Sequence, residues 1–206
     1  MKIQLKAKKQ KGFTIIELVV VILLLGILAA TALPRFLDVT DEAHASVVEG
    51  VRGGLATGSA LFRATWVATG QSTTAAVADY GLGTLFANSN GYPIGTAAGD
   101  PTVNTCVQAY DGLLQGGRPT AVAATVANGA TAEARETAIE TAATATTDVV
   151  AVLEQAADIE DSTSCSFYYV GQFKEGTSTA NVSLPLISYD FTTGEISQTT
   201  LVLDDD

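Results

Sequence analysis

The strongest hydrophobic pattern in this chain is a nearly uninterrupted apolar run close to its N-terminus. Residues 13–33 are long enough to cross a bilayer as a helix, which rises about 1.5 Å per residue. Beyond this run, apolar residues recur at steps of three, four or seven, the period of an amphipathic helix: Phe36, Val39, Ala43, Val47, Val51, Leu55, Phe62 and Trp66. We therefore predict one helix from about Thr14 to Thr69, with an apolar part (13–34) and an amphipathic part (35–69).

Two residues interrupt the apolar part of this helix, Gly26 and Pro34. Because proline lacks an N–H group and crowds the carbonyl of residue 30, we predict a kink or a loosened turn there. Four glycines weaken the amphipathic part by up to about 1 kcal/mol each relative to alanine: Gly50, Gly53, Gly54 and Gly58. We expect close packing against a sheet to compensate for them.

Residues 70–206 have the pattern of a globular head that ends in strands. Three segments are rich in β-branched and aromatic residues: Ser166–Phe173, Val182–Tyr189 and Glu195–Leu203. Thr192-Thr193-Gly194 supplies a tight turn between the last two, and Pro185 indicates an edge position or a bulge. The predicted fold class is α+β, with the amphipathic helix packed on a C-terminal antiparallel sheet of three or four strands.

The connections before these strands have weaker patterns. Residues 70–101 are rich in Gly, Ala, Thr and Asn and predict loops and turns with one short helix. Residues 116–164 are rich in Ala and Thr; Thr131–Ala145 and Asp148–Ala157 have helical character, with Asp148 as an N-cap. We predict that 116–164 is a variable insertion exposed on the surface.

Charge is distributed unevenly along the chain. The 206 residues carry 11 Lys and Arg against 22 Asp and Glu, a formal net charge of −11. Five of the bases, all lysines, lie in residues 1–12, so a chain without that segment has a formal charge of −16. So acidic a surface repels polyanions, and we predict no nucleic-acid partner.

The apolar run begins with a distinctive motif, Gly12-Phe13-Thr14-Ile15-Ile16-Glu17. A carboxylate inside hydrocarbon costs roughly 2.5–3.5 kcal/mol on insertion scales, so Glu17 needs a partner. The motif resembles the processing site of type IV prepilins. This resemblance implies that a prepilin peptidase removes the leader, residues 1–12, by cleaving between Gly12 and Phe13, and methylates the new amine of Phe13.

The same resemblance gives Glu17 a role in assembly. In the family, the corresponding glutamate pairs with the N-terminal amine of a neighbouring subunit. Phe13 and Glu17 are four residues apart, a spacing that places them on one face of a helix. The pair would neutralise both charges in the apolar core of a filament.

An ordinary secretory signal peptide is the alternative interpretation. Five lysines would form its basic region, Leu18–Ala30 its apolar region, and Ala30-Thr31-Ala32 a cleavage site before Leu33. That interpretation assigns no role to Glu17.

A softer resemblance extends further along the chain. Leu33-Pro34-Arg35-Phe36-Leu37-Asp38-Val39, with Ala43 and Gly50-Val51, is similar to the mannose-sensitive haemagglutinin (MSHA) branch of type IVa pilins. It implies a major pilin that is held in the inner membrane as a precursor and built by the pilus assembly machinery into a helical homo-oligomer outside the cell. Such a filament serves surface adhesion, aggregation or motility.

A pseudopilin of a type II secretion system is the alternative function. Pseudopilins resemble pilins in the N-terminal helix but usually have smaller heads, often stabilised by calcium and without a disulfide. The long head and the two cysteines favour the pilus.

The two cysteines are Cys106 and Cys165. In an exported domain such a pair more often forms a disulfide than a metal site, although two separate buried thiols are the alternative. A bridge closing a loop of about 60 residues would contribute on the order of 4 kcal/mol. We expect it to join the variable segment to the edge of the sheet.

No pattern typical of an enzyme was found, and we predict neither catalysis nor a cofactor. The single histidine, His44, lies among acids and fits a solvated helix face. Two carboxylate clusters were considered as calcium ligands, Asp158 with Glu160 and Asp161, and Asp204 to Asp206. We predict no metal at either.

Overall fold

The computed structural model describes residues 12–99, 101–127, 129–155, 162–172 and 183–202. The chain divides into two compact units, residues 1–43 and residues 44–206, and each is described by itself. The fold class is α+β, as predicted.

A single long helix, α1, runs from Ile15 to Ala68, within one residue of the predicted ends. Gly26 and Pro34 both lie inside this one helix, and a kink at either stays a prediction. From residue 13 to residue 33 every side chain is exposed within the first unit. Among the described residues of its unit, this part of α1 therefore has no apolar partner that buries it.

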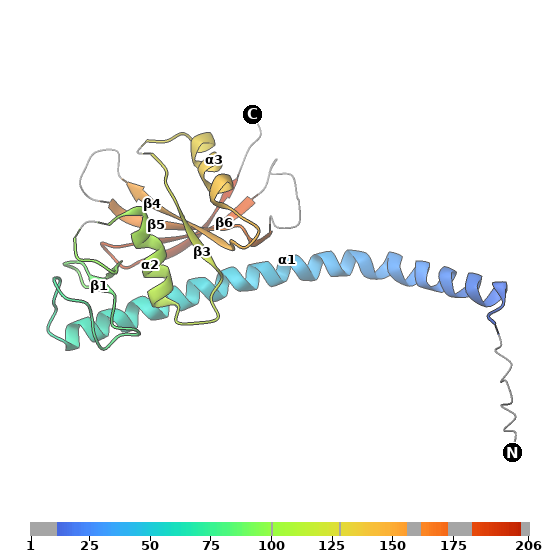
Figure 1. Cartoon of the computed structure of the whole chain (residues 1–206), viewed down its shortest axis with the longest axis horizontal. Coiled ribbons are helices and arrows are strands. Elements are labelled where there is room, and N and C mark those ends of the chain that lie inside the picture. The colour runs from blue at the N-terminus through green and yellow to red at the C-terminus, as the bar shows by residue number, and fades with distance from the viewer. Residues whose placement is uncertain (1–11, 100, 128, 156–161, 173–182, 203–206) are drawn as a thin grey trace, which may run out of the picture. The chain divides into compact units, whose positions relative to one another are not determined.

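The second unit contains a five-stranded sheet in the order β3-β4-β5-β6-β7 (Figure 1). The strands are β3 (Ala121–Ala124), β4 (Val149–Gln155), β5 (Ser162–Tyr169), β6 (Ser183–Asp190) and β7 (Ile196–Val202). β3 pairs in parallel with β4, and the other neighbours are antiparallel. The last two predicted strands are confirmed as β6 and β7, whereas β5 begins four residues before the predicted Ser166 and ends at Tyr169. The sheet is larger than the three or four strands that we expected.

The extra strands come from the Ala- and Thr-rich segment, and this corrects the prediction of an exposed insertion. The predicted helix from Asp148 is the strand β4, in which Val149, Val150, Ala151, Val152 and Leu153 are all at most 4% exposed. A strand buried on both faces has a continuous apolar run, which periodicity alone cannot distinguish from a helix. Asp148 caps no helix; its carboxylate accepts a hydrogen bond from the backbone N–H of Thr120, at 2.8 Å.

The other helix predicted in this segment is confirmed. α3 runs from Ala132 to Ala142, and the hydroxyl of its N-cap Thr131 accepts a hydrogen bond from the N–H of Ala134. Ile139 is the buried residue of this helix.

Residues 70–99 contain two short paired strands, β1 (Phe86–Ala87) and β2 (Pro93–Gly95), where we expected a short helix. The turn between them uses Gly91, whose φ of 83° suits glycine. The next helix, α2 (Val103–Leu113), lies beyond the predicted segment. Its N-cap is Thr102, which shares a capping box with Thr105.

The sheet carries a hydrophobic layer on each face. Alternate residues of β4 and β5 face one way and pack with α1 and α2, and the intervening residues pack with α3. Figure 1 shows α3 on the other side of the sheet from α1. The first layer includes Leu55, Phe62, Tyr110, Phe167 and Tyr189, each at most 1% exposed.

The apolar stripe predicted on the amphipathic helix is right from Val51 onward and wrong at Val39, Ala43 and Val47; Phe36 lies outside the side chains that the structure describes. The buried position one turn earlier is Val48, 1% exposed, whereas Val47 is 38% exposed. Successive steps of four overshoot the 3.6-residue turn, so the predicted stripe drifts off the buried face. Val39 and Ala43 are exposed as well.

The four glycines of the amphipathic helix do not pack on the sheet as expected. Modelling a Cβ onto Gly58 brings it 2.9 Å from the carbonyl oxygen of Leu113, and one on Gly54 meets the side chain of Leu114. Both contacts lie at the end of α2. For Gly50 and Gly53, no atom lies within 4 Å of such a Cβ.

Pro185 lies in β6, which is an inner strand of the sheet rather than an edge strand. It faces Thr200 of β7 in a regular register, so the predicted bulge is wrong. On the β5 side, the first pair is Tyr168 with Leu186, one residue further along. Among the described pairs, Pro185 is therefore not paired with a residue of β5. At such a position a strand residue does not have to donate an N–H group to the neighbouring strand, so proline is tolerated.

Candidate functional site

The Gly12–Phe13 peptide lies immediately before α1 and is open to solvent. Phe13 is 88% exposed, and a Cβ added to Gly12 would have no atom within 4 Å. The fold therefore gives no steric reason for glycine at position 12. A requirement for glycine would come from a partner that approaches this backbone.

Glu17 and Thr14 form a reciprocal cap at the start of α1. The Glu17 Oε2 atom accepts hydrogen bonds from the backbone N–H and the hydroxyl of Thr14, both at 2.8 Å. In return, the N–H of Glu17 donates to the Thr14 hydroxyl at 3.3 Å. This is a capping box, in which a threonine and a glutamate three residues apart satisfy the first free N–H groups of a helix.

Sequence reasoning missed Thr14, although its spacing from Glu17 is the signature of a capping box. The cap holds the carboxylate of Glu17 back toward the helix start, next to the residue that follows Phe13. A carboxylate offers about four acceptor positions, so two hydrogen bonds do not saturate it. Glu17 can therefore keep its cap and accept a further cationic donor.

The helix that follows this cap is apolar on all sides. Ile15–Leu33 has a mean hydropathy of 2.8, none of it is buried, and it is the one helix in the described part of the chain that is long and apolar enough to cross a membrane. A capped helix start with one acid thus leads directly into a segment of membrane-spanning length.

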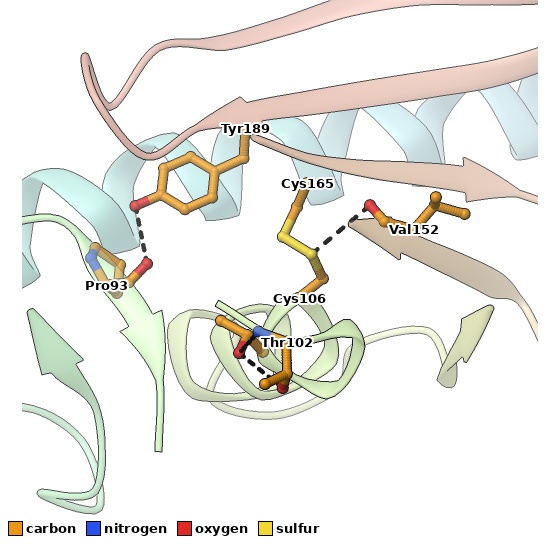
Figure 2. The surroundings of a disulfide bond; sticks show 7 residues. Pro93, Thr102, Cys106, Val152, Cys165 and Tyr189 are labelled. Atoms are coloured by element: carbon orange, nitrogen blue, oxygen red, sulfur yellow. Dashed lines mark hydrogen bonds between the residues drawn. A yellow bond between two sulfur atoms is a disulfide. The ribbon is translucent and has the colours of Figure 1, made fainter. Parts of the chain in front are cut away.

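In the head, Cys106 and Cys165 form the predicted disulfide. Both residues are fully buried, with Cα atoms 5.5 Å apart, and the Cys106 Sγ atom lies 3.7 Å from the carbonyl oxygen of Val152. Figure 2 shows the bridge between α2 and β5, with Val152 of β4 beside it. We had expected the disulfide at the edge of the sheet, and this is wrong. Because β5 is the middle strand of five, the disulfide is attached to the centre of the sheet.

His44 contacts the sheet instead of lying on a solvated helix face, as the sequence had indicated. Its Nδ1 atom lies 2.8 Å from the hydroxyl of Tyr169, and the two rings are tilted with centroids 5.6 Å apart. The side chain is half-buried rather than on a solvated face. It joins α1 to the end of β5 and is a structural contact.

Among the described residues, no group of three or more His, Cys, Asp and Glu side chains could hold a metal ion. The acids considered as calcium ligands, 158 to 161 and 204 to 206, lie outside the described residues.

The face of the sheet that packs with α3, its outer face, carries a half-buried ionic cluster. Arg135 of α3 forms a salt bridge with Glu154 of β4 and donates to the hydroxyl of Tyr168 at 3.2 Å. The side chains of Arg135 and Glu154 are 24% and 26% exposed. Burial raises the pKa of Tyr168.

Two further tyrosines, Tyr110 and Tyr189, are buried on the side of the sheet that packs with α1 and α2. The hydroxyl of Tyr189 donates to the carbonyl oxygen of Pro93 at 3.2 Å, as Figure 2 shows. The hydroxyl of Tyr110 donates to the carbonyl oxygen of Pro119 at 3.3 Å. Burial raises the pKa of both hydroxyls, because the phenolate form loses its solvation.

Together, the fold and the N-terminal geometry define a class of protein: an α+β domain carried on a long helix whose exposed apolar start follows a Gly-Phe junction. Residues 7–33 match the prokaryotic N-terminal methylation motif. No solved structure matches the chain.

Three curated relatives are similar to part of this chain. The major component of the type IV narrow pilus of Thermus thermophilus is 41% identical over 83 residues, 40% of this chain and 63% of the relative. The type IV major alpha-pilin of Moraxella bovis is 47% identical over 55 residues, 26% of this chain and 35% of the relative. A type IV major pilin of Neisseria gonorrhoeae is 60% identical over 37 residues, 18% of this chain and 22% of the relative.

Part of this chain is therefore similar to type IV major pilins, and residues 7–33 carry the prokaryotic N-terminal methylation motif. The similarity spans less than two thirds of each of these relatives. None of them is described as an MSHA pilin, and that finer resemblance stays a prediction.

Proposed function

We propose that this protein is the structural subunit, a major pilin, of a type IV pilus. The observation that carries the proposal is the methylation motif at the start of an exposed apolar helix, in a chain whose curated relatives include type IV major pilins. A helix of this kind is insoluble alone, and a membrane or a bundle of identical helices would cover it.

The N-terminal segments would act in turn in processing, anchoring and assembly. A prepilin peptidase would cleave between Gly12 and Phe13, remove residues 1–12 and methylate the new amine. Before cleavage the apolar helix anchors the precursor in the inner membrane. The pilus assembly machinery then moves the subunit into a helical homo-oligomer at the cell surface, which serves adhesion, aggregation or motility.

The Glu17 carboxylate would bind the Phe13 amine of a neighbouring subunit in that filament. Its cap by Thr14 supports this role, because the carboxylate is already turned toward the helix start. In a water-free filament core, pairing would offset part of the cost of burying both charges.

The buried disulfide supports the pilus over the type II secretion pseudopilin. As a structural subunit, the protein would need no catalytic group.

The test is N-terminal sequencing with intact-mass measurement on protein sheared from the cell surface. We expect a chain that begins at methylated Phe13. A chain beginning at Leu33 would show that an ordinary signal peptide had been removed, and the pilus proposal would fall.

A further inference from the structure

The second unit contains a pocket of about 500 Å³, which we call the head pocket. Three segments line it, residues 80–85, 108–112 and 115–118, together with Thr96. Its volume is within the range of about 300–1,000 Å³ that is typical of small-molecule sites. It adjoins a larger pocket beside Gly50 of α1, and the two share the connection that follows α2. The proposed function gives the head pocket no role.

Two leucines make part of the head pocket apolar. Leu85 is 2% exposed, and a Cβ added to Gly112 would lie 2.6 Å from the Leu85 side chain, so α2 packs directly on this leucine. Leu82 is 93% exposed, so the fold of the described chain does not bury this large hydrophobic side chain. A ligand with apolar C–H groups would gain free energy by covering it.

An oriented amide provides hydrogen-bond donors to the head pocket. The Gln108 Oε1 atom accepts a hydrogen bond from the backbone N–H of Thr96, at 3.0 Å. This bond fixes which end of the amide is the oxygen. Among the described residues, no hydrogen bond engages the amide nitrogen of Gln108, so its two N–H groups can donate to a ligand.

Arg118 and Asp111 provide one charge of each sign. The Arg118 Nε atom donates to Asp111 Oδ1 at 2.7 Å, and Arg118 Nη1 donates to the carbonyl oxygen of Leu114 at 3.2 Å. A guanidinium has five N–H donors and a carboxylate about four acceptor positions, so both groups keep positions for a ligand. The described lining holds no other charged residue, and the head pocket is therefore neutral overall.

This set of groups favours a neutral ligand with several hydroxyl groups over a charged ligand. A charged ligand would compete with the ion pair between Asp111 and Arg118, which already neutralises both side chains. A hydroxyl group both donates and accepts, so it can bind the remaining positions of either side chain without breaking the pair. The C–H groups of a sugar ring would pack on the leucines.

We propose that the head pocket binds a neutral sugar, either free or as the terminal unit of a glycan. Asp111 accepts hydrogen bonds from its hydroxyl groups, and Gln108 and Arg118 donate to its oxygen atoms. This inference goes beyond the proposed function, because a pocket in the second unit can bind a sugar whether or not the subunits form a pilus.

The first test locates the binding. The full chain is prepared in a zwitterionic detergent that has no sugar group and titrated with glucose, galactose, mannose, N-acetylglucosamine, lactose and cellobiose, while its backbone amide NMR signals are followed. We expect at least one sugar to shift the signals of residues 82–85 and 108–118 until they saturate. No saturable shift there with any of the sugars would overturn the inference.

The second test changes the donors of the head pocket. Gln108→Glu keeps an oxygen that accepts from the Thr96 N–H but replaces both N–H donors with an acceptor. We expect the dissociation constant of the sugar to rise by about tenfold or more. The matched control, Gln198→Glu, makes the same change at an exposed position of β7 outside the pocket and should bind like wild type.

A third variant tests the inference even if Gln108→Glu lowers the stability of the fold. Leu82→Ala shortens an exposed side chain, so thermal unfolding should not change. The dissociation constant should rise by about threefold or more, because the sugar covers less apolar surface.

The remaining outcomes would each overturn the sugar site. They are wild-type affinity in folded Gln108→Glu or in Leu82→Ala, equal losses in Gln108→Glu and Gln198→Glu, and shifts of the same signals by sodium acetate or sodium sulfate at lower concentration than by any sugar. The last result would make Arg118 an anion site. All of them leave the pilus proposal standing, whereas a surface protein that does not begin at Phe13 would overturn the pilus proposal alone.

Discussion

The two parts of α1 differ in where their apolar side chains find partners. From Ile15 to Leu33 the helix is apolar all round and entirely exposed within its unit. From Val48 to Trp66 it is amphipathic, and its apolar face is buried against the sheet and α2. The first part therefore has its apolar side chains exposed among the described residues, and the second has them buried by the fold of its own chain.

This difference tells where each kind of mutation acts. Substitutions at the start of α1 lie in the first unit, and we expect them to alter processing or assembly. Substitutions in the head change the free energy of unfolding first. The predictions below test that separation, from the largest expected effect to the smallest.

Glu17→Val should give the largest effect, loss of filaments, because it removes the carboxylate proposed to bind the Phe13 amine. Cleavage after Gly12 should continue, and the thermal stability of the head in detergent should not change. Filament yield in the sheared fraction measures the first effect, and intact mass measures the second.

Glu17→Gln is the matched control, since glutamine also completes a capping box but carries no charge. It should cap α1 through Thr14 and yet assemble poorly. Wild-type filament yield from Glu17→Gln would attribute the role of Glu17 to capping and remove the proposed ion pair.

Breaking the disulfide should give the largest loss of head stability. Cys106→Ser and Cys165→Ser should each lower the free energy of unfolding by about 2–5 kcal/mol, to a similar degree, because either one opens the same loop. Denaturant unfolding of the full chain in detergent measures this. A clear difference between the two variants would mean that more than the cross-link had been lost.

The sequence predicted those parts of the molecule in which one local pattern dominates. α1 was found from its apolar period, β5 to β7 from their β-branched residues, and the disulfide from the number of cysteines. These features depend little on what surrounds them.

The sequence failed where tertiary packing decides between alternatives. Val149–Leu153 is an apolar run that is compatible with a helix or a buried strand, and its neighbours β3 and β5 make it a strand. At the N-terminus, the sequence leaves two partners open for Glu17, the hydroxyl and N–H of Thr14 within the helix and an amine of another subunit, and the prediction named the second alone. The sequence could not predict the pocket beside Gly50, because its second wall comes from residues 113–119, which are distant in the chain.

The head should lose stability in alkaline solution. Burial raises the pKa values of Tyr110, Tyr168 and Tyr189 above the ordinary value, which is about 10. As the pH rises, the unfolded chain therefore releases these protons before the folded chain does. The contribution of the three tyrosines to the free energy of unfolding is constant below about pH 10 and falls above it, by up to about 1.4 kcal/mol per pH unit for each buried tyrosine. Unfolding between pH 8 and pH 11 measures the slope; Tyr189→Phe should flatten it, and an unchanged slope would contradict this assignment.

Arg135→Met should destabilise the outer face of the sheet by about 1–2 kcal/mol, because it leaves Glu154 without its charged partner in a half-buried site. Arg52→Met is the control: the Arg52–Glu49 pair is 40% and 56% exposed, and pairs of that kind are worth about 0–1 kcal/mol. Equal losses in the two variants would show that burial does not strengthen the Arg135 pair.

The smallest predicted effect is a gain. Gly50→Ala adds a Cβ where no atom lies within 4 Å, so it should stabilise α1 by about 0.4–1 kcal/mol through a more restricted unfolded chain. Gly58→Ala makes the same change 2.9 Å from the Leu113 carbonyl oxygen and should be destabilising instead, by about 1–3 kcal/mol. The two midpoints of thermal unfolding should therefore move in opposite directions. A lower midpoint for Gly50→Ala would contradict the assignment of Gly50 to an open position of α1.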